Sequence, residues 1–291
     1  MSPFPSILLP LDGSPLAARG IGCTVWLAER LNAQLHILSA APERPAQEEL
    51  RRLQVPESHW RHVTLHQAPA YPADAILAHI TRLDTALVVM SAVGEGAADR
   101  GDVSAPALVG RVTHAVIERS PVPVLLLPPG YRERLPWRRS LVPLSGEVQA
   151  DDALALAVRV AVALDMEVHA AHVADPQDGH LEASTRYADA IHHEYPSQLD
   201  EFVRRALPTC APADCSRIVE LALCTGSTAD ELLGLIGSRN IDLIVVGWAG
   251  RFMRGRARIL RQLLAAITQA VLLVKPAPTP PFRLKVQEEL G

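Results

Sequence analysis

The sequence predicts an α/β protein made of two tandem, doubly wound domains, each with a five-stranded parallel sheet. A length of 291 residues fits about two domains at roughly 150 residues each. Apolar runs such as Ala86–Met90 are continuous rather than alternating, which is typical of strands covered by helices on both faces. Segments of the first half also recur, in order, in the second. We therefore expect right-handed crossovers with helices on both faces of each sheet.

The composition predicts a protein with a large core and excludes some classes of partner. Hydrophobic residues make up 48% and charged residues 21% of the chain, enough to bury a large core. With 28 basic and 32 acidic residues the net charge is −4, so neither nucleic acid nor an anionic membrane is an expected partner. The chain has neither a signal-peptide pattern at its start nor an apolar run long enough for a membrane span. We expect a cytoplasmic protein.

The first half alternates strands and helices. Ile7–Leu11 is the first strand, and Ser14 and Pro15 are the cap and first position of a helix. That helix buries a face on which apolar and small residues recur every three or four positions: Leu16, Gly20, Cys23, Leu27 and Leu31. The later elements are strands at Leu35–Ala40, Val63–Gln67, Ala86–Ala92 and Val122–Leu127, and helices at Pro72–Leu83 and Ala107–Arg119.

Three segments of the second half repeat segments of the first. Leu141–Gly146 matches Leu8–Gly13 at an offset of 133 residues. Leu243–Gly250 matches Leu87–Gly94 at an offset of 156, and a third pair, 271–274 and 124–127, matches at 147. The offset first grows because the second half carries a longer segment at 175–216, and then shrinks because its loop after Gly250 is shorter. The agreement in order and type indicates a duplication.

These matches set the expected domain limits. We place the first domain at residues 1–130, the second at 139–277 and a tail at 278–291, with a short polar linker at Arg132–Arg138. The function of the 175–216 segment is not readable from its sequence. In doubly wound sheets, ligands bind beyond the carboxyl ends of the strands where strand order reverses. The candidate site residues are therefore those that follow the first and fourth strands of each half.

At these residues the chain resembles the universal stress protein family, as a tandem two-domain member. The resemblance rests on Ile7–Ser14, on Arg119–Leu127, on Cys224–Leu233 and on Val245–Gly250, and covers both halves. It implies a Rossmann-like fold of the adenine nucleotide alpha hydrolase type. It also implies that fifth strands pair edge to edge, which would protect the otherwise open edges of Val122–Leu127 and Ala270–Val274. We predict that these two strands pair within the chain as a pseudo-dimer. Whether two chains form a homodimer stays open.

Family members that bind ATP share three features, and the resemblance implies ATP as the cofactor here. An Asp ends the first strand, a Gly-x-x-Gly follows the fourth, and a Gly-Ser or Gly-Thr opens the next helix, where N–H groups and the helix dipole favour phosphate. In this chain Asp12 would contact ribose, and the backbone of Leu11 and Ala40 would face adenine. Phosphate would lie among Ser91, Gly94, Gly110 and Arg111. The full candidate set is Pro10, Leu11, Asp12, Ala40, Met90, Ser91, Gly94, Gly110, Arg111, Val112, Gly247 and Gly250.

Both halves depart from the pattern. In the first, Ser91 replaces a Gly, Arg111 replaces the hydroxyl residue, and the loop from Gly94 to Gly110 is six residues too long and contains Glu95, Asp99 and Asp102. In the second, Gly247 and Gly250 are present but Ser145 stands at the Asp position. The basic stretch Arg251–Arg258 is either an anion contact or a solvated helix start.

Two functions remain open. The first is a stress-response regulatory protein that binds ATP in its first half, with an unknown protein partner. The second is an interaction protein that has lost both sites. No catalytic residue is expected, because no serine has a nucleophile motif and Asp12 reads as a ribose or turn residue, so ATP hydrolysis would at most be slow and incidental. No metal is expected, because Cys210, Cys215 and the histidines at 59, 62, 66, 169 and 172 lack ligand spacing.

Overall fold

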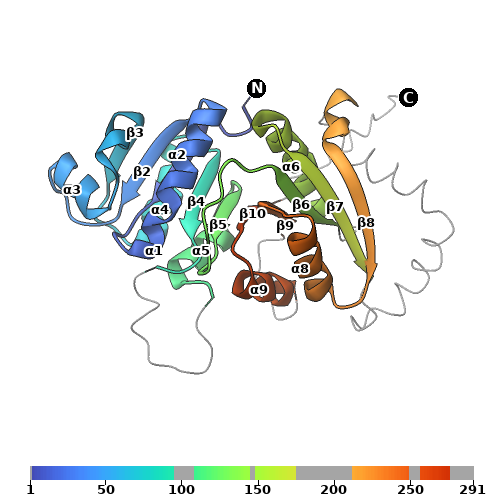
Figure 1. Cartoon of the computed structure of the whole chain (residues 1–291). Helices are drawn as coiled ribbons and strands as arrows, with labels where there is room; N and C mark the ends of the chain where they lie inside the picture. Colours follow the sequence, from blue (N-terminus) through green and yellow to red (C-terminus); the bar gives the residue numbers. More distant parts are fainter. Residues whose placement is uncertain (1, 95–107, 145–147, 175–211, 249–255, 276–291) are drawn as a thin grey trace, which may run out of the picture.

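The computed structural model describes residues 2–94, 108–144, 148–174, 212–248 and 256–275. Its centre is one ten-stranded sheet in the order β3-β2-β1-β4-β5-β10-β9-β6-β7-β8 (Figure 1). The first five strands are β1 Ser6–Pro10, β2 Gln34–Ser39, β3 Val63–Gln67, β4 Leu87–Ser91 and β5 Val124–Leu127. The second five are β6 Arg139–Leu144, β7 Glu167–Ala174, β8 Ile218–Thr225, β9 Leu243–Gly247 and β10 Ala270–Val274.

The two halves have the same strand order. Counted from the outer edge, the first half runs third, second, first, fourth, fifth, and the second half repeats this order from β8 to β10. Neighbouring strands within each half are parallel. The predicted fold class is therefore confirmed. Strand order reverses between β1 and β4 in the first half and between β6 and β9 in the second, which places the two expected ligand positions.

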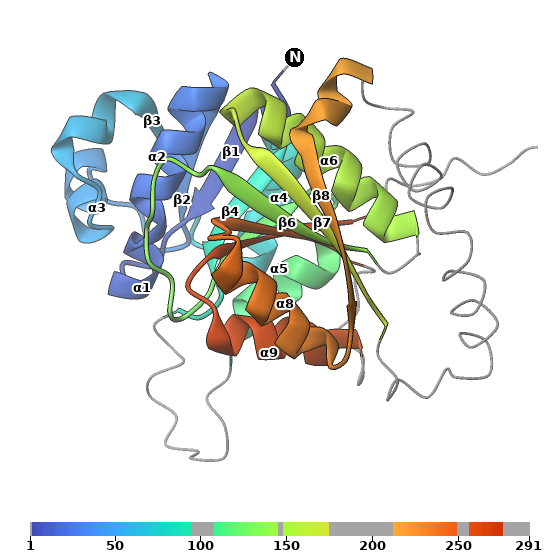
Figure 2. The ribbon, with the colours of Figure 1, turned by 45° about the vertical axis from the view of Figure 1, so that its right-hand side comes forward.

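Helices cover both faces of the sheet. The helices of the first half are α1 Pro15–Ala18, α2 Gly20–Leu31, α3 Ala46–Arg52, α4 Pro72–Arg82 and α5 Arg111–Arg119, with a 3-10 turn η1 at Glu57–His62. Those of the second are α6 Val148–Leu164, α8 Thr228–Ser238 and α9 Arg256–Ala266, with η3 at Pro212–Arg217. One buried apolar cluster joins α2, α3 and α6, and another joins α4, α5, α8 and α9. Figure 2 shows α6 behind the strands of the second half and α8 and α9 in front of them.

The two halves join through their fifth strands. β5 and β10 are antiparallel, with Leu125 opposite Leu272 and Leu126 opposite Val271. All four side chains are buried, because helices of both halves cover this junction. The predicted pairing of the fifth strands within the chain is confirmed. Neither strand is left as an open edge.

The linker between the halves packs against both of them. Trp137 is buried, and its ring lies edge-on to Trp26 of α2 with 5.2 Å between ring centroids. The backbone N–H of Arg132 donates to the carbonyl of Thr268, and that of Arg138 donates to the Asp242 carboxylate. The polar side chains of the linker are therefore exposed, whereas its backbone N–H groups and the buried Trp137 hold the halves together. The domain limits themselves stay a prediction.

The structure corrects some expected elements. The first helix is divided into α1 and α2 at Arg19, and Gly20 follows directly because a side chain there would meet Leu127 at 2.9 Å. β5 begins at Val124 rather than 122, since the Ser120 hydroxyl takes the N–H of Val122. The sequence reading missed α3, in which only Glu49 and Leu50 are buried, so its apolar period is too short to detect. The tail 278–291 and most of the 175–216 segment lie outside the described residues.

Candidate functional site

The carboxyl ends of β1 and β4 carry the candidate residues of the first half. The two strands are neighbours, with Ile7 opposite Leu87 and Leu8 opposite Val88. Pro10 is the last residue of β1 and half-buried, and Met90 near the end of β4 is buried in the core. The chain then leaves both strands at the same edge of the sheet. This register brings the segment after β1 next to the segment after β4.

Asp12 and Gly94 meet at this edge. One oxygen of the Asp12 carboxylate, Oδ1, accepts the N–H of Ser14 at 2.8 Å, which holds the turn that follows β1. The other oxygen, Oδ2, lies where a side chain on Gly94 would be, because a Cβ built there would stand 2.6 Å from it. The residue at 94 must therefore be Gly if the carboxylate is to keep this place. Asp12 itself is exposed to solvent.

The start of α5 lies beside the same glycine. Gly110 is the N-cap of α5, and its N–H donates to the carbonyl of Ala92 at 2.7 Å. The Thr113 hydroxyl donates to the carbonyl of Ser91 at 3.0 Å, which fixes the first turn of the helix against the end of β4. Arg111 is exposed and Val112 is half-buried. Since Gly110 offers no side-chain oxygen, it leaves the first N–H groups of α5 to other acceptors, as an anion site requires.

A buried ion pair that the sequence reading did not find closes the β2 side of this edge. Glu49 of α3 is fully buried and binds Arg52 through both carboxylate oxygens, at 2.6 and 2.8 Å. The guanidinium of Arg52 also donates to the carbonyl of Asp12 at 3.0 Å and to the Ser39 hydroxyl at 3.2 Å. The hydrogen bonds from Arg52 and Ser39 lower the pKa of Glu49 against the opposing effect of burial. Arg52 therefore fixes the backbone on which Asp12 stands.

This network also explains the glycine that follows Asp12. Gly13 has a φ of +91°, and a Cβ there would lie 2.7 Å from Nη1 of Arg52. The only signal for the network in the sequence is the spacing of Glu49 and Arg52, which are three residues apart on a helix. That spacing is common on solvated helix faces, so it did not identify a site.

The backbone predicted to face adenine is less accessible than the exposed Asp12 carboxylate predicted to contact ribose. Leu11 is buried and its backbone N–H already donates to the carbonyl of Leu38, so this N–H is not available to a ligand. Ala40 is half-buried and packs with the second apolar cluster. The residues predicted to contact ribose and phosphate thus lie together at one edge. On the side predicted for adenine, the backbone is buried or half-buried.

The second half contributes less to a described site. Gly247 ends β9. The next residue, Trp248, is buried, and its backbone N–H donates to the carbonyl of Val274. Ser145, Gly250 and residues 251–255 of the basic stretch lie outside the described residues, as do Glu95, Asp99 and Asp102 of the first half. The predicted second-half contacts therefore stay predictions.

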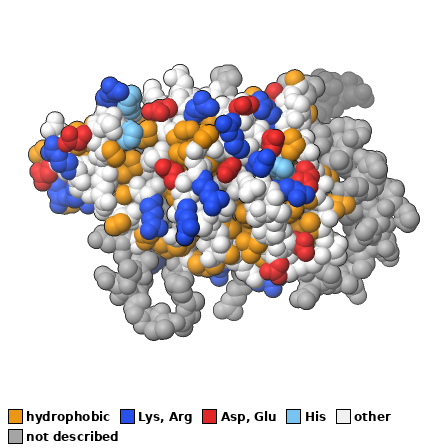
Figure 3. Space-filling view, in the orientation of Figure 1, with side chains coloured by type: hydrophobic (Ala, Val, Ile, Leu, Met, Phe, Trp, Pro, Cys, Tyr) orange, Lys and Arg blue, Asp and Glu red, His pale blue; other side chains and the backbone are white. Residues whose placement is uncertain are grey.

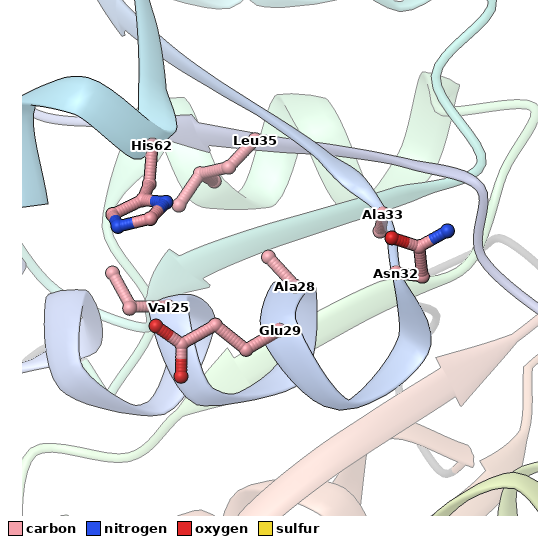
Figure 4. Close-up of a pocket in the computed structure, with 7 residues that line it drawn as sticks. All are labelled: Val25, Ala28, Glu29, Asn32, Ala33, Leu35 and His62. Carbon is pink, nitrogen blue, oxygen red and sulfur yellow. The ribbon is translucent and has the colours of Figure 1, made fainter.

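A pocket elsewhere in the first half does not coincide with either predicted site (Figure 4). It measures about 300 Å³ and lies between α2, η1 and the start of β2, at the amino ends of the strands. Val25, Ala28 and Leu35 form an apolar floor, and the exposed side chains of Glu29 and His62 stand at its rim. The pocket is open to solvent. It lies at the opposite end of β2 from Ser39 and the site edge.

Neither a reactive Cys23 thiol nor a cluster of metal ligands is found in the described part of the chain. Cys23 is buried and its pKa is raised to about 12 by burial, so its thiolate is not formed at neutral pH. Among the described residues no group of three or more His, Cys, Asp or Glu side chains is placed to hold a metal ion. In the same residues, no helix combines the length and hydrophobicity that crossing a membrane demands.

The fold and the strand-end site define a tandem α/β protein of the doubly wound class. The sequence profile of the universal stress protein family matches residues 46–128 and 136–279, more than half of the chain. The chain therefore belongs to the universal stress protein family, as the resemblance predicted. The first match begins after Asp12. No curated protein matches the chain.

Solved structures share the whole tandem fold. A protein from Pseudomonas aeruginosa UCBPP-PA14, provisionally assigned as a universal stress protein, is 16% identical, with a TM-score of 0.64 and 94% of each chain covered. A functionally unknown protein from Pseudomonas aeruginosa PAO1 is 15% identical, with a TM-score of 0.65 and coverage of 94% of this chain and 93% of that one. A universal stress protein from Archaeoglobus fulgidus is 15% identical, with a TM-score of 0.58 and coverage of 94% and 97%. At these identities the likeness concerns the fold.

Proposed function

We propose that this stress-response protein is a regulatory binding protein whose first half holds an adenine nucleotide at the edge formed by Asp12, Gly94 and Gly110. One observation carries the proposal. Three residues far apart in the sequence meet at the point where strand order reverses, with a carboxylate over one glycine and, beside it, the start of a helix whose N-cap glycine has no capping side chain. This is the arrangement that a nucleotide with one polar sugar and one anionic tail would use.

Each part of the ligand has a partner of matching chemistry. Asp12 would accept hydrogen bonds from ribose hydroxyls, and Gly94 would let the backbone approach phosphate oxygens. The first turn of α5 and the guanidinium of Arg111 would balance phosphate charge. The proposed mechanism is regulatory: occupancy changes a surface that a protein partner reads. We assign no catalytic residue, so hydrolysis is at most incidental, and we place the protein in the cytoplasm.

A second candidate is an interaction protein without a nucleotide. The Glu49–Arg52 pair favours it, because Arg52 already occupies the carbonyl of Asp12 and the hydroxyl of Ser39 on the side where the base would lie. The two candidates differ in one measurable property, the affinity of the first half for ATP.

Calorimetric titration of the full chain with ATP and Mg²⁺ decides between them. Asp12→Asn keeps an oxygen that can accept the Ser14 N–H and removes only the charge, whereas Asp12→Ala removes both. We expect both variants to weaken ATP binding at least tenfold, and Arg111→Met to weaken ATP more than adenosine. Asp230→Asn, an exposed carboxylate in the first turn of α8, is the matched control and should bind as the natural protein does.

The outcome against the proposal is also clear. If the natural protein releases no heat with millimolar ATP, the nucleotide proposal fails and the interaction protein remains. If ATP binds equally well to Asp12→Ala and to the natural protein, the site lies elsewhere in the chain.

A further inference from the structure

Three histidines and an arginine form a connected group at the outer edge of the first half. His36 lies on β2, His66 on the edge strand β3, and His79 and Arg82 lie on α4. Nδ1 of His36 and Nε2 of His66 are 3.1 Å apart. Nη2 of Arg82 is 2.7 Å from Nε2 of His79 and 3.4 Å from Nδ1 of His66. His36 and His79 are buried and His66 is half-buried.

The arginine determines which ring nitrogens carry protons. A guanidinium can only donate, so Nε2 of His79 and Nδ1 of His66 must accept from Arg82. His79 then donates from Nδ1 to the carbonyl of Ala75, 2.8 Å away. His66 carries its hydrogen on Nε2 and donates it to Nδ1 of His36. The whole set of bonds is satisfied only when all three imidazoles are neutral.

Protonation of any of these rings breaks a bond. A proton added to Nδ1 of His36 would face the N–H of His66, and a proton added to His66 or His79 would face the N–H of Arg82. A proton on His66 or His79 would also add a positive charge beside the guanidinium. The described charged and titratable groups that act on His66 are His36, His79 and Arg82, none of them a carboxylate. Burial, and then these neighbours, lower the pKa of His66 to about 4, and burial lowers the pKa of His36.

We propose that this group is a proton-sensitive contact that holds β3 and α4 on the sheet at neutral pH and releases them as the pH falls. The physical cause is that His36 and His66 take a proton freely when the edge is open, whereas in the closed edge an added proton would break a hydrogen bond. Because the pKa of His66 is about 4 in the closed state against 6.5 for a free histidine, the stability that the contact gives the closed edge is complete above pH 6.5 and decreases as the pH falls from 6.5 toward 4. This inference does not depend on the nucleotide proposal.

The second half contains an internal reference. His169 stands 133 residues after His36, the offset that relates the first strands of the two halves, and it has the same register, since His36 is opposite Leu8 and His169 is opposite Leu141. Here a carboxylate oxygen of Glu220 is 2.9 Å from Nδ1 of His169, and one of Glu167 is 3.9 Å from Nε2. An added proton would therefore face carboxylates. The same register position therefore has carboxylate neighbours in the second half and an imidazole neighbour in the first.

The released edge adjoins the strand-end site. The backbone N–H of Ala68, which directly follows β3, donates to the carbonyl of Ser39, and the Ser39 hydroxyl is bound to the Glu49–Arg52 pair. Opening of β3 would remove the bond to Ser39. Acid would then change the position of the residues that surround the turn at Asp12.

Hydrogen exchange of the full chain, read by mass spectrometry at pH 7.5 and pH 5.0 and corrected for intrinsic rates, tests the proposal. We expect the opening equilibrium constant of the amides in β3 and α4 to be about tenfold larger at pH 5.0 than at pH 7.5. This is less than the full pKa shift of His66 would give, because His66 is partly exposed. Amides of β8 and α8 should change less than twofold. An equal response of both edges, or none at β3 and α4, would overturn the proposal.

Two variants and one spectroscopic measurement separate the histidine group from general acid effects. His66→Gln keeps a donor to His36 but cannot take a proton at neutral or mildly acid pH, so it should reduce the pH response of β3 and α4. His169→Gln, at the position of the other half that matches His36, should leave that response unchanged. If His66→Gln does not fold, nitrogen NMR of the natural protein still decides. His66 should carry its proton on Nε2 and stay neutral at pH 5.5, and an imidazolium there would refute the proposal.

Discussion

The two halves of this chain share a strand order but satisfy their polar groups differently. In the first half a carboxylate, two glycines and a helix start meet beyond β1 and β4, and the outer edge holds three histidines with an arginine. In the second half β6 ends without an Asp at the matching position. Its outer edge holds His169 between Glu220 and Glu167, with Arg239 bound to Glu220 at 2.6 Å. Figure 3 shows basic and acidic side chains mixed across one face of both halves.

This difference separates the features that the shared fold determines from the polar contacts that vary between the halves. The buried aliphatic strands set register and strand order in both halves, and this frame accepts a buried imidazole at one register position in each. Its partners are free to differ, because they come from edge strands and helix ends that reach the imidazole from outside the core. Four substitutions sharpen this comparison, in order of decreasing expected effect.

The junction should be the most sensitive place, because both halves depend on it. Leu125→Ala removes a buried side chain opposite Leu272 and leaves a cavity between the halves. We expect a loss of about 3 kcal/mol in the free energy of unfolding, measured with urea. Val162→Ala, whose side chain is exposed on α6, is the control and should cost less than about 0.5 kcal/mol. A loss as small at Leu125 would mean that the junction does not share a core.

The ion pair under Asp12 should come next. Glu49→Ala removes the carboxylate that accepts hydrogen bonds from Arg52 and from the Ser39 hydroxyl. Breaking a fully buried pair would cost more, but the Arg52 side chain is 30% exposed. We therefore expect a loss of about 2 kcal/mol in the free energy of unfolding. The control is Glu48→Ala, which removes the exposed neighbouring carboxylate of the same helix. If the two variants unfold at the same urea concentration, the pair has no structural role.

The glycine beneath Asp12 should affect ligand rather than stability. Gly94→Ala places a Cβ 2.6 Å from Oδ2 of Asp12 and forces the carboxylate aside. If the first half binds ATP, we expect affinity by calorimetry to fall at least tenfold, with little change in unfolding. Gly234→Ala in α8 is the matched control, since a Cβ there meets nothing within 4 Å. Unchanged ATP affinity in Gly94→Ala would remove Asp12 from the site.

The smallest expected effect is the acid response of the second half. Hydrogen bonds from Arg239 and His169 lower the pKa of Glu220 to about 2 from an ordinary 4.5. Its contribution to stability is therefore present above pH 4.5 and is lost as the pH falls from 4.5 to 2. Because the pair is partly exposed, we expect only about 0.5 kcal/mol. Urea unfolding at pH 6 and pH 3 should show a smaller difference in Glu220→Gln than in the natural protein.

A control for that measurement comes from the first half. Glu57→Gln removes the exposed ion pair with Arg51 and should leave the difference between pH 6 and pH 3 nearly as it is in the natural protein. If Glu220→Gln and Glu57→Gln behave alike, the bonds of Glu220 are no stronger than a surface pair.

Sequence reasoning located much of the candidate site but not its supports. Asp12 and Gly94 were identified because they follow strands with clear aliphatic runs, and Gly110 because the family resemblance places a glycine at the start of the next helix. The structure brings the three together. Glu49 and Arg52 were missed because their helix buries only two residues and leaves no apolar period. The histidine group was likewise unreadable, since His36, His66 and His79 belong to three elements and no spacing relates them.

By itself the sequence determined the class of fold, the duplication and the pairing of the fifth strands. The fold class and the duplication follow from local runs of aliphatic residues, which must be buried on both faces wherever they lie. The pairing of the fifth strands follows from the resemblance to the family. Only the tertiary structure decided which polar groups meet, that is, Arg52 under Asp12, Arg82 between two histidines, and carboxylates around His169. Such contacts depend on ångström-scale distances between elements far apart in the chain, and burial patterns carry no information at that scale.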